Sequence, residues 1–144
     1  ARSLAERLPA DLTDLHLNFR GCRIGEAGAR AVAERLPANL SELHLDFESC
    51  VISESNVQDV AKRLPCGLTQ LYLNFAGCFS STETLCCLAE HLPRGLEHLH
   101  LNFAGCGLNA TAARRLTANL ARGLRELRLD FSNCSLHNEG VRAV

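Results

Sequence analysis

Residues 15–19 read Leu-His-Leu-Asn-Phe, and the pattern Leu-x-Leu-x-Phe returns every 28 residues along the chain. The later copies begin at Leu43, Leu71, Leu99 and Leu127. Because successive side chains of an extended segment point to opposite faces, the leucines and phenylalanine of each copy share one face and the polar residues share the other. The pattern predicts five similar short strands, and a fixed period of this length is typical of a solenoid.

The segments between these strands change to helical spacing. Val57, Val60, Ala61 and Leu64 occupy positions i, i+3, i+4 and i+7, which places them on one stripe of a helix. We expect the helices to begin after capping residues and to end before prolines, namely Ser53, Ser81 and Asn109 at the starts and Pro37, Pro65 and Pro93 beyond the ends. Each unit is therefore predicted to be one strand followed by one helix.

A cysteine stands three residues after each repeated phenylalanine, at Cys22, Cys50, Cys78, Cys106 and Cys134. Five equivalent cysteines cannot all pair in disulfides, and a straight row does not provide the tetrahedral set of ligands that zinc requires. We therefore predict a buried structural ladder of free thiols. With Cys66, Cys86 and Cys87 the chain has eight cysteines, and eight unpaired thiols predict an intracellular, reducing compartment, with the cytoplasm as the first expectation.

The chain resembles leucine-rich repeat proteins over its whole length. The turn cysteine and the segment 24–33, Ile-Gly-Glu-Ala-Gly-Ala-Arg-Ala-Val-Ala, are most similar to the ribonuclease-inhibitor-like class of long, cysteine-containing repeats. The resemblance implies an α/β solenoid of five 28-residue strand–helix repeats, and it implies that each turn cysteine points inward. Because parallel strands stack about 4.8 Å apart and helices need roughly 8–10 Å, we expect a horseshoe with a concave parallel sheet and convex helices.

Both ends of the chain fall inside a repeat. Residues 1–9 match residues 29–37 closely, and residues 139–144 match the segment that begins at Glu26. We therefore expect residues 1–144 to form a single solenoid segment that is uncapped at both ends. Such a segment is a slice of a longer array, or its ends are covered by partner subunits, because each repeat buries its core only against neighbours.

Equivalent strand positions are expected to form columns of polar side chains on the concave face. The first column holds Asp14, Glu42, Gln70, His98 and Glu126; the second holds His16, His44, Tyr72, His100 and Arg128; the third holds Asn18, Asp46, Asn74, Asn102 and Asp130. Carboxylates outnumber arginines in these columns, whereas Arg30, Lys62, Arg63, Arg114 and Arg115 fall on the helical side. This division predicts a basic protein partner and argues against nucleic acid on the concave face.

The candidate partner-binding residues are His16, His44, Asp46, Tyr72, Asn74, His98, His100, Asn102, Arg128 and Asp130. Tyr72 is the chain's one tyrosine and the expected anchor. The histidines, with Asp46 beside them, are a conceivable zinc or copper site, but straight strand rows do not converge on one ion, so we expect no metal.

The sequence contains no catalytic pattern. Gly105-Cys106-Gly107 lacks the spacing of a phosphate loop, and a nucleophile elbow and a zinc-spaced cysteine pair are both absent. An uninterrupted apolar stretch long enough to span a membrane is also absent. We expect no enzyme activity, no cofactor and no membrane insertion.

Three functions fit this sequence. The first is a non-catalytic scaffold that binds a partner protein through the concave sheet. The second is a structural subunit of a large assembly, which contacts its neighbours through its ends and its convex helices. The third is the sensor or regulatory repeat region of a larger signalling protein, as the resemblance to such repeats implies.

Overall fold

The computed structural model describes residues 2–78 and 81–134. Within them, one parallel sheet contains strands in the order in which they occur along the chain. The strands are β1 (Asp14–Asn18), β2 (Glu42–Asp46), β3 (Gln70–Asn74), β4 (His98–Asn102) and β5 (Glu126–Asp130). Each residue pairs with the residue 28 positions further on, as in Leu15 with Leu43. The strand pattern and its register are as the repeat predicts.

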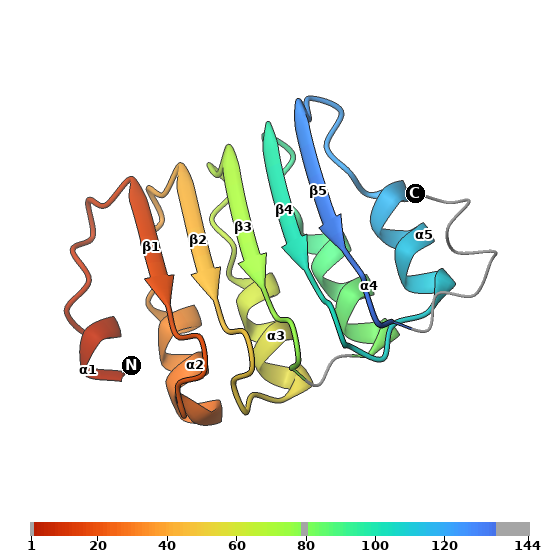
Figure 1. Ribbon diagram of the computed structural model, residues 1–144. Coiled ribbons are helices and arrows are strands. Elements are labelled where there is room, and N and C mark those ends of the chain that lie inside the picture. The colour runs from red at the N-terminus through yellow and green to blue at the C-terminus, as the bar shows by residue number, and fades with distance from the viewer. Residues whose placement is uncertain (1, 79–80, 135–144) are drawn as a thin grey trace.

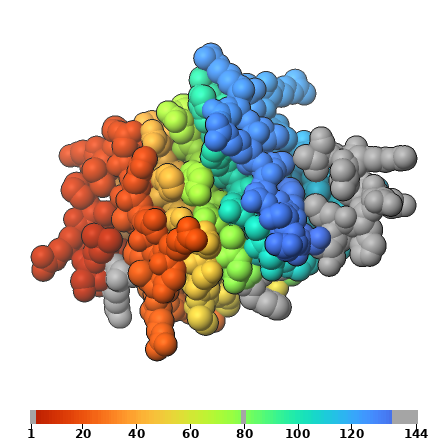
Figure 2. All heavy atoms as spheres, viewed as in Figure 1, coloured from red at the N-terminus to blue at the C-terminus, as the bar shows by residue number. Residues whose placement is uncertain are grey.

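Helices cover one face of this sheet and leave the other face open (Figure 1). They are α1 (Arg2–Ala5), α2 (Gly25–Glu34), α3 (Glu54–Lys62), α4 (Thr82–His91) and α5 (Ala110–Ala118). Consecutive strands contact each other and consecutive helices contact each other, so each repeat packs against its neighbours along the stack. Figure 2 shows the same order as successive bands of colour. The predicted α/β leucine-rich repeat solenoid is confirmed.

The repeated phenylalanines form a stacked file between the sheet and the helices. Phe47, Phe75 and Phe103 are fully buried. Their ring centroids are 5.6 Å apart at each step. Phe19 and Phe131 are only partly buried because each has a described neighbouring ring on one side alone. Burial of a phenylalanine contributes about 1.5–3 kcal/mol, so this file is a principal source of cohesion between repeats.

The helix boundaries follow from local capping. Ser53, Ser81 and Asn109 are the N-cap residues of α3, α4 and α5, as expected. The Asn109 side chain accepts hydrogen bonds from the backbone N–H groups of Thr111 and Ala112, which have no partner inside the helix. The stripe predicted for α3 faces the core, since Val57, Val60 and Ala61 are buried.

The turn thiols tie each repeat to the one before it. The Sγ atoms of Cys50 and Cys78 each lie 3.0 Å from a carbonyl oxygen of the preceding repeat, on Phe19 and Phe47. Cys106 and Cys134 repeat the contact at 3.4 and 3.1 Å. The thiol thus donates a weak hydrogen bond to a carbonyl that already accepts the backbone N–H of the turn cysteine in its own repeat.

Cys22 is an exception to the expected buried ladder. Its side chain is exposed, whereas Cys50, Cys78 and Cys106 are buried and Cys134 is half-buried. No turn of a preceding repeat lies over Cys22 among the described residues, so its thiol meets solvent. The inclusion of Cys22 in a buried ladder is therefore wrong, and burial at this position depends on the neighbouring repeat.

Candidate functional site

The third column of polar residues has a structural role in the turns. Asn18, Asp46, Asn74, Asn102 and Asp130 each accept, through Oδ1, the backbone N–H two residues further on, at 2.9–3.0 Å. This is the local Asx hydrogen bond that fixes a chain reversal. Four of these residues are among the predicted partner-binding residues, and the structure shows that one oxygen of each is already committed to the fold.

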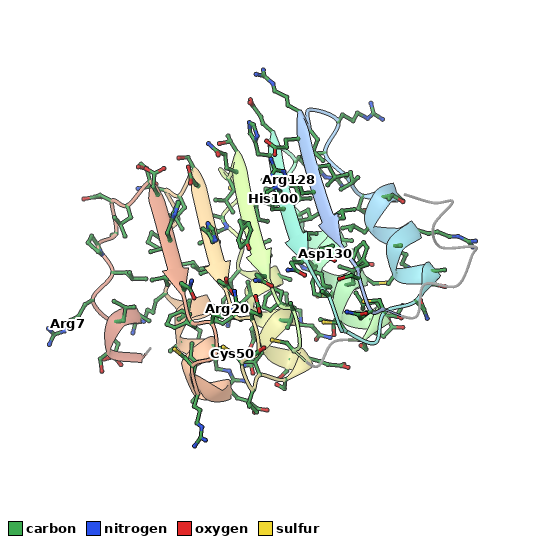
Figure 3. The ribbon with its side chains drawn as sticks, in the orientation of Figure 1. Arg7, Arg20, Cys50, His100, Arg128 and Asp130 are labelled. Atoms are coloured by element: carbon green, nitrogen blue, oxygen red, sulfur yellow. The ribbon has the colours of Figure 1, made fainter. Side chains whose placement is uncertain are left out.

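The second column is a continuous row of rings on the open face. The ring centroids of His16 and His44 are 5.1 Å apart, those of His44 and Tyr72 are 3.8 Å apart, and those of Tyr72 and His100 are 5.7 Å apart. Arg128 continues the row on β5, next to His100 (Figure 3). The strand register therefore brings together predicted residues of all five described strands in one surface strip.

A cavity of about 310 Å³ lies beside this strip, and we call it the trough. Its lining comes from four adjacent strands, so the trough runs across the strands rather than along one. The residues that line it are Glu42, Leu43, His44, Gln70, Leu71, Tyr72, His98, Leu99, His100 and Glu126. The leucine side chains point into the core, so their backbone forms the floor. The first and second columns form the two walls.

Glutamates stand at both ends of the trough, in different settings. Glu126 lies 2.7 Å from the Nε of Arg128 and 3.3 Å from the Nδ1 of His98. The hydrogen bond from His98 and the charge of Arg128 hold the pKa of the Glu126 carboxyl below its usual range. At the other end, Glu42 contacts the Nε2 of His16 at 2.6 Å. One glutamate therefore has an arginine beside it and the other has a histidine.

Burial favours the neutral form of the histidines in the wall. It lowers the pKa of both His44 and His100, and His16 and Arg128 respectively lower it further. The His100 Nε2 atom is buried without a hydrogen-bond partner and lies 3.6 Å from a Glu126 oxygen, which is beyond hydrogen-bond range. At neutral pH the central wall is thus uncharged and aromatic.

A second cavity of about 210 Å³ lies on the other side of the same row. It is lined by Tyr72, His100, Leu101, Asn102, Arg128, Leu129 and Asp130. Tyr72 and His100 therefore form a ridge between two hollows. Partial burial and the charge of Asp46 raise the pKa of the Tyr72 hydroxyl, which keeps it protonated and able to donate a hydrogen bond.

An ion pair between Arg20 and Glu48 joins the segments that follow β1 and β2. Arg20 lies 2.8 Å from Glu48, and the Asn74 side-chain amide donates to the same glutamate at 3.1 Å. Arg20 is labelled in Figure 3 at this end of the sheet. The pair leaves Asp46, only 7% exposed, without an arginine partner among the residues that the structure describes.

The histidines do not assemble a metal site in the described part of the chain. No group of three or more histidine, cysteine, aspartate or glutamate side chains there is placed to hold an ion. The pairs on neighbouring strands, such as His16 and His44, lie side by side in a row. Among the described helices, none is both long and apolar enough to cross a bilayer.

The trough also includes side chains outside the predicted set. Glu42, Gln70 and Glu126 line it, whereas the predicted residues come mainly from the second and third columns. The first column carries the signal that identifies them, because residues two apart on a strand face the same way. Conversely, Asp46 and Asn74 of the third column are buried and contribute little accessible surface.

One family comparison bears on this architecture. A family model described as Leucine Rich repeat matches residues 15–33, which span most of β1 and most of α2. No curated protein matches the chain significantly. The matched stretch contains the strand and turn on which the repeat pattern is based. This match and the sheet topology agree on the fold of a leucine-rich repeat solenoid, and leucine-rich repeat domains generally mediate protein–protein interaction.

Proposed function

We propose that this chain is a non-catalytic interaction module that binds a partner protein through the open face of its sheet, at the Tyr72–His100 ridge and its flanking hollows. The observation that carries the proposal is the trough itself, an aromatic-walled cavity built by four repeats in register. Aromatic side chains in recessed, partly desolvated positions are the usual anchors of protein interfaces.

The thiol contacts support two finer assignments. Turn cysteines that donate to the preceding repeat fit the ribonuclease-inhibitor-like class of long repeats. The described cysteines are all free, including Cys50 and Cys78 in the core, and free thiols fit an intracellular, reducing compartment. No step of the proposed function requires a cofactor or a metal.

The test compares two surfaces of one protein. The double variant Tyr72→Ala/His100→Ala removes the ridge while leaving the phenylalanine file intact. Arg115→Glu alters the helical side instead, where Arg115 is exposed and lies 3.8 Å from Glu90. Each variant is immobilised, incubated with lysate from the source cells, and its captured proteins are quantified by mass spectrometry. We expect the ridge variant to lose a partner that wild type and Arg115→Glu both retain.

The opposite pattern refutes the proposal. If Arg115→Glu abolishes capture and the ridge variant does not, the helical side makes the contacts, as in a structural subunit of an assembly. Circular dichroism of each variant verifies that the fold is unchanged before capture results are compared.

A further inference from the structure

The charge on the open face is distributed unevenly along the stack of repeats. At the β1–β2 end, three carboxylates, on Asp14, Glu42 and Asp46, have no arginine or lysine partner among the described residues. Asp14 and Glu42 are directly paired in the strand register, so their carboxylates leave the sheet from adjacent strands. At the β5 end, by contrast, Arg128 neutralises Glu126, and among the described residues of that strand Asp130 alone is a carboxylate without such a partner. Of these carboxylates Glu42 and Glu126 line the trough, so one end of the trough has a glutamate without an arginine or lysine and the other has a glutamate that Arg128 neutralises.

Two glutamates on the open face already form ion pairs with arginines of this chain. Arg128 binds Glu126 at 2.7 Å, and Arg20 binds Glu48 at 2.8 Å, each from the neighbouring column or strand. Glu42 occupies the same column as Glu126 but is paired with His16, whose side chain is 57% exposed. An exposed imidazole is easily displaced, and Glu42 then presents a carboxylate that guanidinium or ammonium groups fit.

The trough walls beside Glu42 can contact the alkyl stem of an arginine or lysine side chain. The rings of His44 and Tyr72 lie 3.8 Å apart at this end of the trough, and an aromatic face next to a carboxylate holds a cation's alkyl stem and its charge together. The trough crosses four strands, or about 14 Å at a strand spacing near 4.8 Å. That length accommodates roughly four residues of an extended peptide at about 3.4 Å each.

We propose that the trough binds an extended basic segment of the partner protein, with an arginine or lysine side chain seated at Glu42 against the rings of His44 and Tyr72. This inference rests on the proposed function and adds the chemistry of the occupant. Complementary charge at the β1–β2 end selects a basic segment, and the uncharged central wall accepts the backbone and small side chains that follow.

The experiment uses peptides of defined charge as probes. Fluorescein-labelled octapeptides that alternate glycine with arginine, glutamate or glutamine are titrated with the protein, and binding is followed by fluorescence anisotropy at low and physiological ionic strength. We expect the arginine peptide to bind and the other two to bind at least tenfold more weakly. Glu42→Gln, which keeps the side-chain shape, is expected to weaken the arginine peptide about fivefold.

Glu90→Gln is the matched control, because it removes an exposed carboxylate from α4 on the helical side. We expect it to change arginine-peptide binding less than twofold. The inference is overturned if the arginine peptide fails to bind, if the glutamine or glutamate peptide binds as tightly, or if Glu90→Gln weakens binding as much as Glu42→Gln.

The two proposals fail separately. If the ridge variant loses its natural partner and the arginine peptide does not bind, the open face is an interface for a partner that is not basic, and only the present inference falls. If the ridge variant captures the natural partner as well as the wild type does, the proposed function is wrong, whatever the octapeptides show.

Discussion

Phe75→Ala tests the cohesion of the stack at its centre. The Phe75 ring is fully buried, with neighbouring rings 5.6 Å away on both sides. Replacing a core phenylalanine by alanine costs about 3–5 kcal/mol, and each lost ring pair adds about 0.5–1.5 kcal/mol in measured cycles. We expect a loss near the top of the first range, about 4–5 kcal/mol. For a chain of this size the melting temperature then falls by roughly 10–20 °C.

Phe131→Ala is the matched comparison. Its ring is only partly buried and has one described ring neighbour, with centroids 6.5 Å apart. The same truncation there is expected to cost about half as much, near 2 kcal/mol. Both variants are unfolded in urea and followed by circular dichroism under identical conditions. Equal losses, or a larger loss for Phe131→Ala, contradict the idea that stacking between repeats supplies the stability.

Three further outcomes follow from individual contacts. Asp46→Ala leaves the Glu48 N–H without its acceptor at 2.9 Å and is expected to cost about 1–2 kcal/mol in urea unfolding, whereas Asp46→Asn removes the same charge but keeps an acceptor oxygen and is expected to cost less; equal losses contradict the role given to Oδ1. Burial raises the pKa of the Cys78 thiol to about 12. Iodoacetamide at neutral pH is therefore expected to label the exposed cysteines of the native chain and to react with Cys78 only in denaturant, which peptide mass spectrometry measures. Fast labelling of Cys78 in the native chain contradicts its burial. Burial lowers the pKa of His44 and His100, so below about pH 6.5 these histidines bind protons more readily in the unfolded chain than in the folded chain. The free energy of unfolding is therefore expected to decrease from neutral to mildly acidic pH, and to decrease less steeply in the double variant His44→Gln/His100→Gln.

The repeat pattern alone predicts most of the fold. A spacing of 28 residues places Leu15 opposite Leu43 in register, because a parallel sheet between identical units satisfies every copy in the same way. The columns of the open face follow from the same register. Helix starts at Ser53 and Asn109 also follow from the sequence, since capping depends on neighbours within one turn.

The details that the pattern does not predict depend on surroundings or on side-chain conformation. Cys22 carries the same local sequence signal as Cys50 but is exposed, since its burial depends on another repeat. The pairing of Glu42 with His16, and of Glu126 with Arg128, depends on rotamers that no spacing encodes. The role of the Asx column is different, because an asparagine or aspartate two residues before a turn N–H is a local signal that sequence inspection can detect.

The most direct test of the central proposal places a photoreactive residue on each face. Benzoylphenylalanine is incorporated at Tyr72 in one protein and at Lys62, an exposed position on α3, in another. Both proteins are irradiated in lysate from the source cells, and cross-linked species are identified by mass spectrometry. Binding through the open face predicts a specific partner adduct from position 72 and none from position 62. An adduct from position 62 alone, or the same adduct from both positions, contradicts binding through the open face of the sheet.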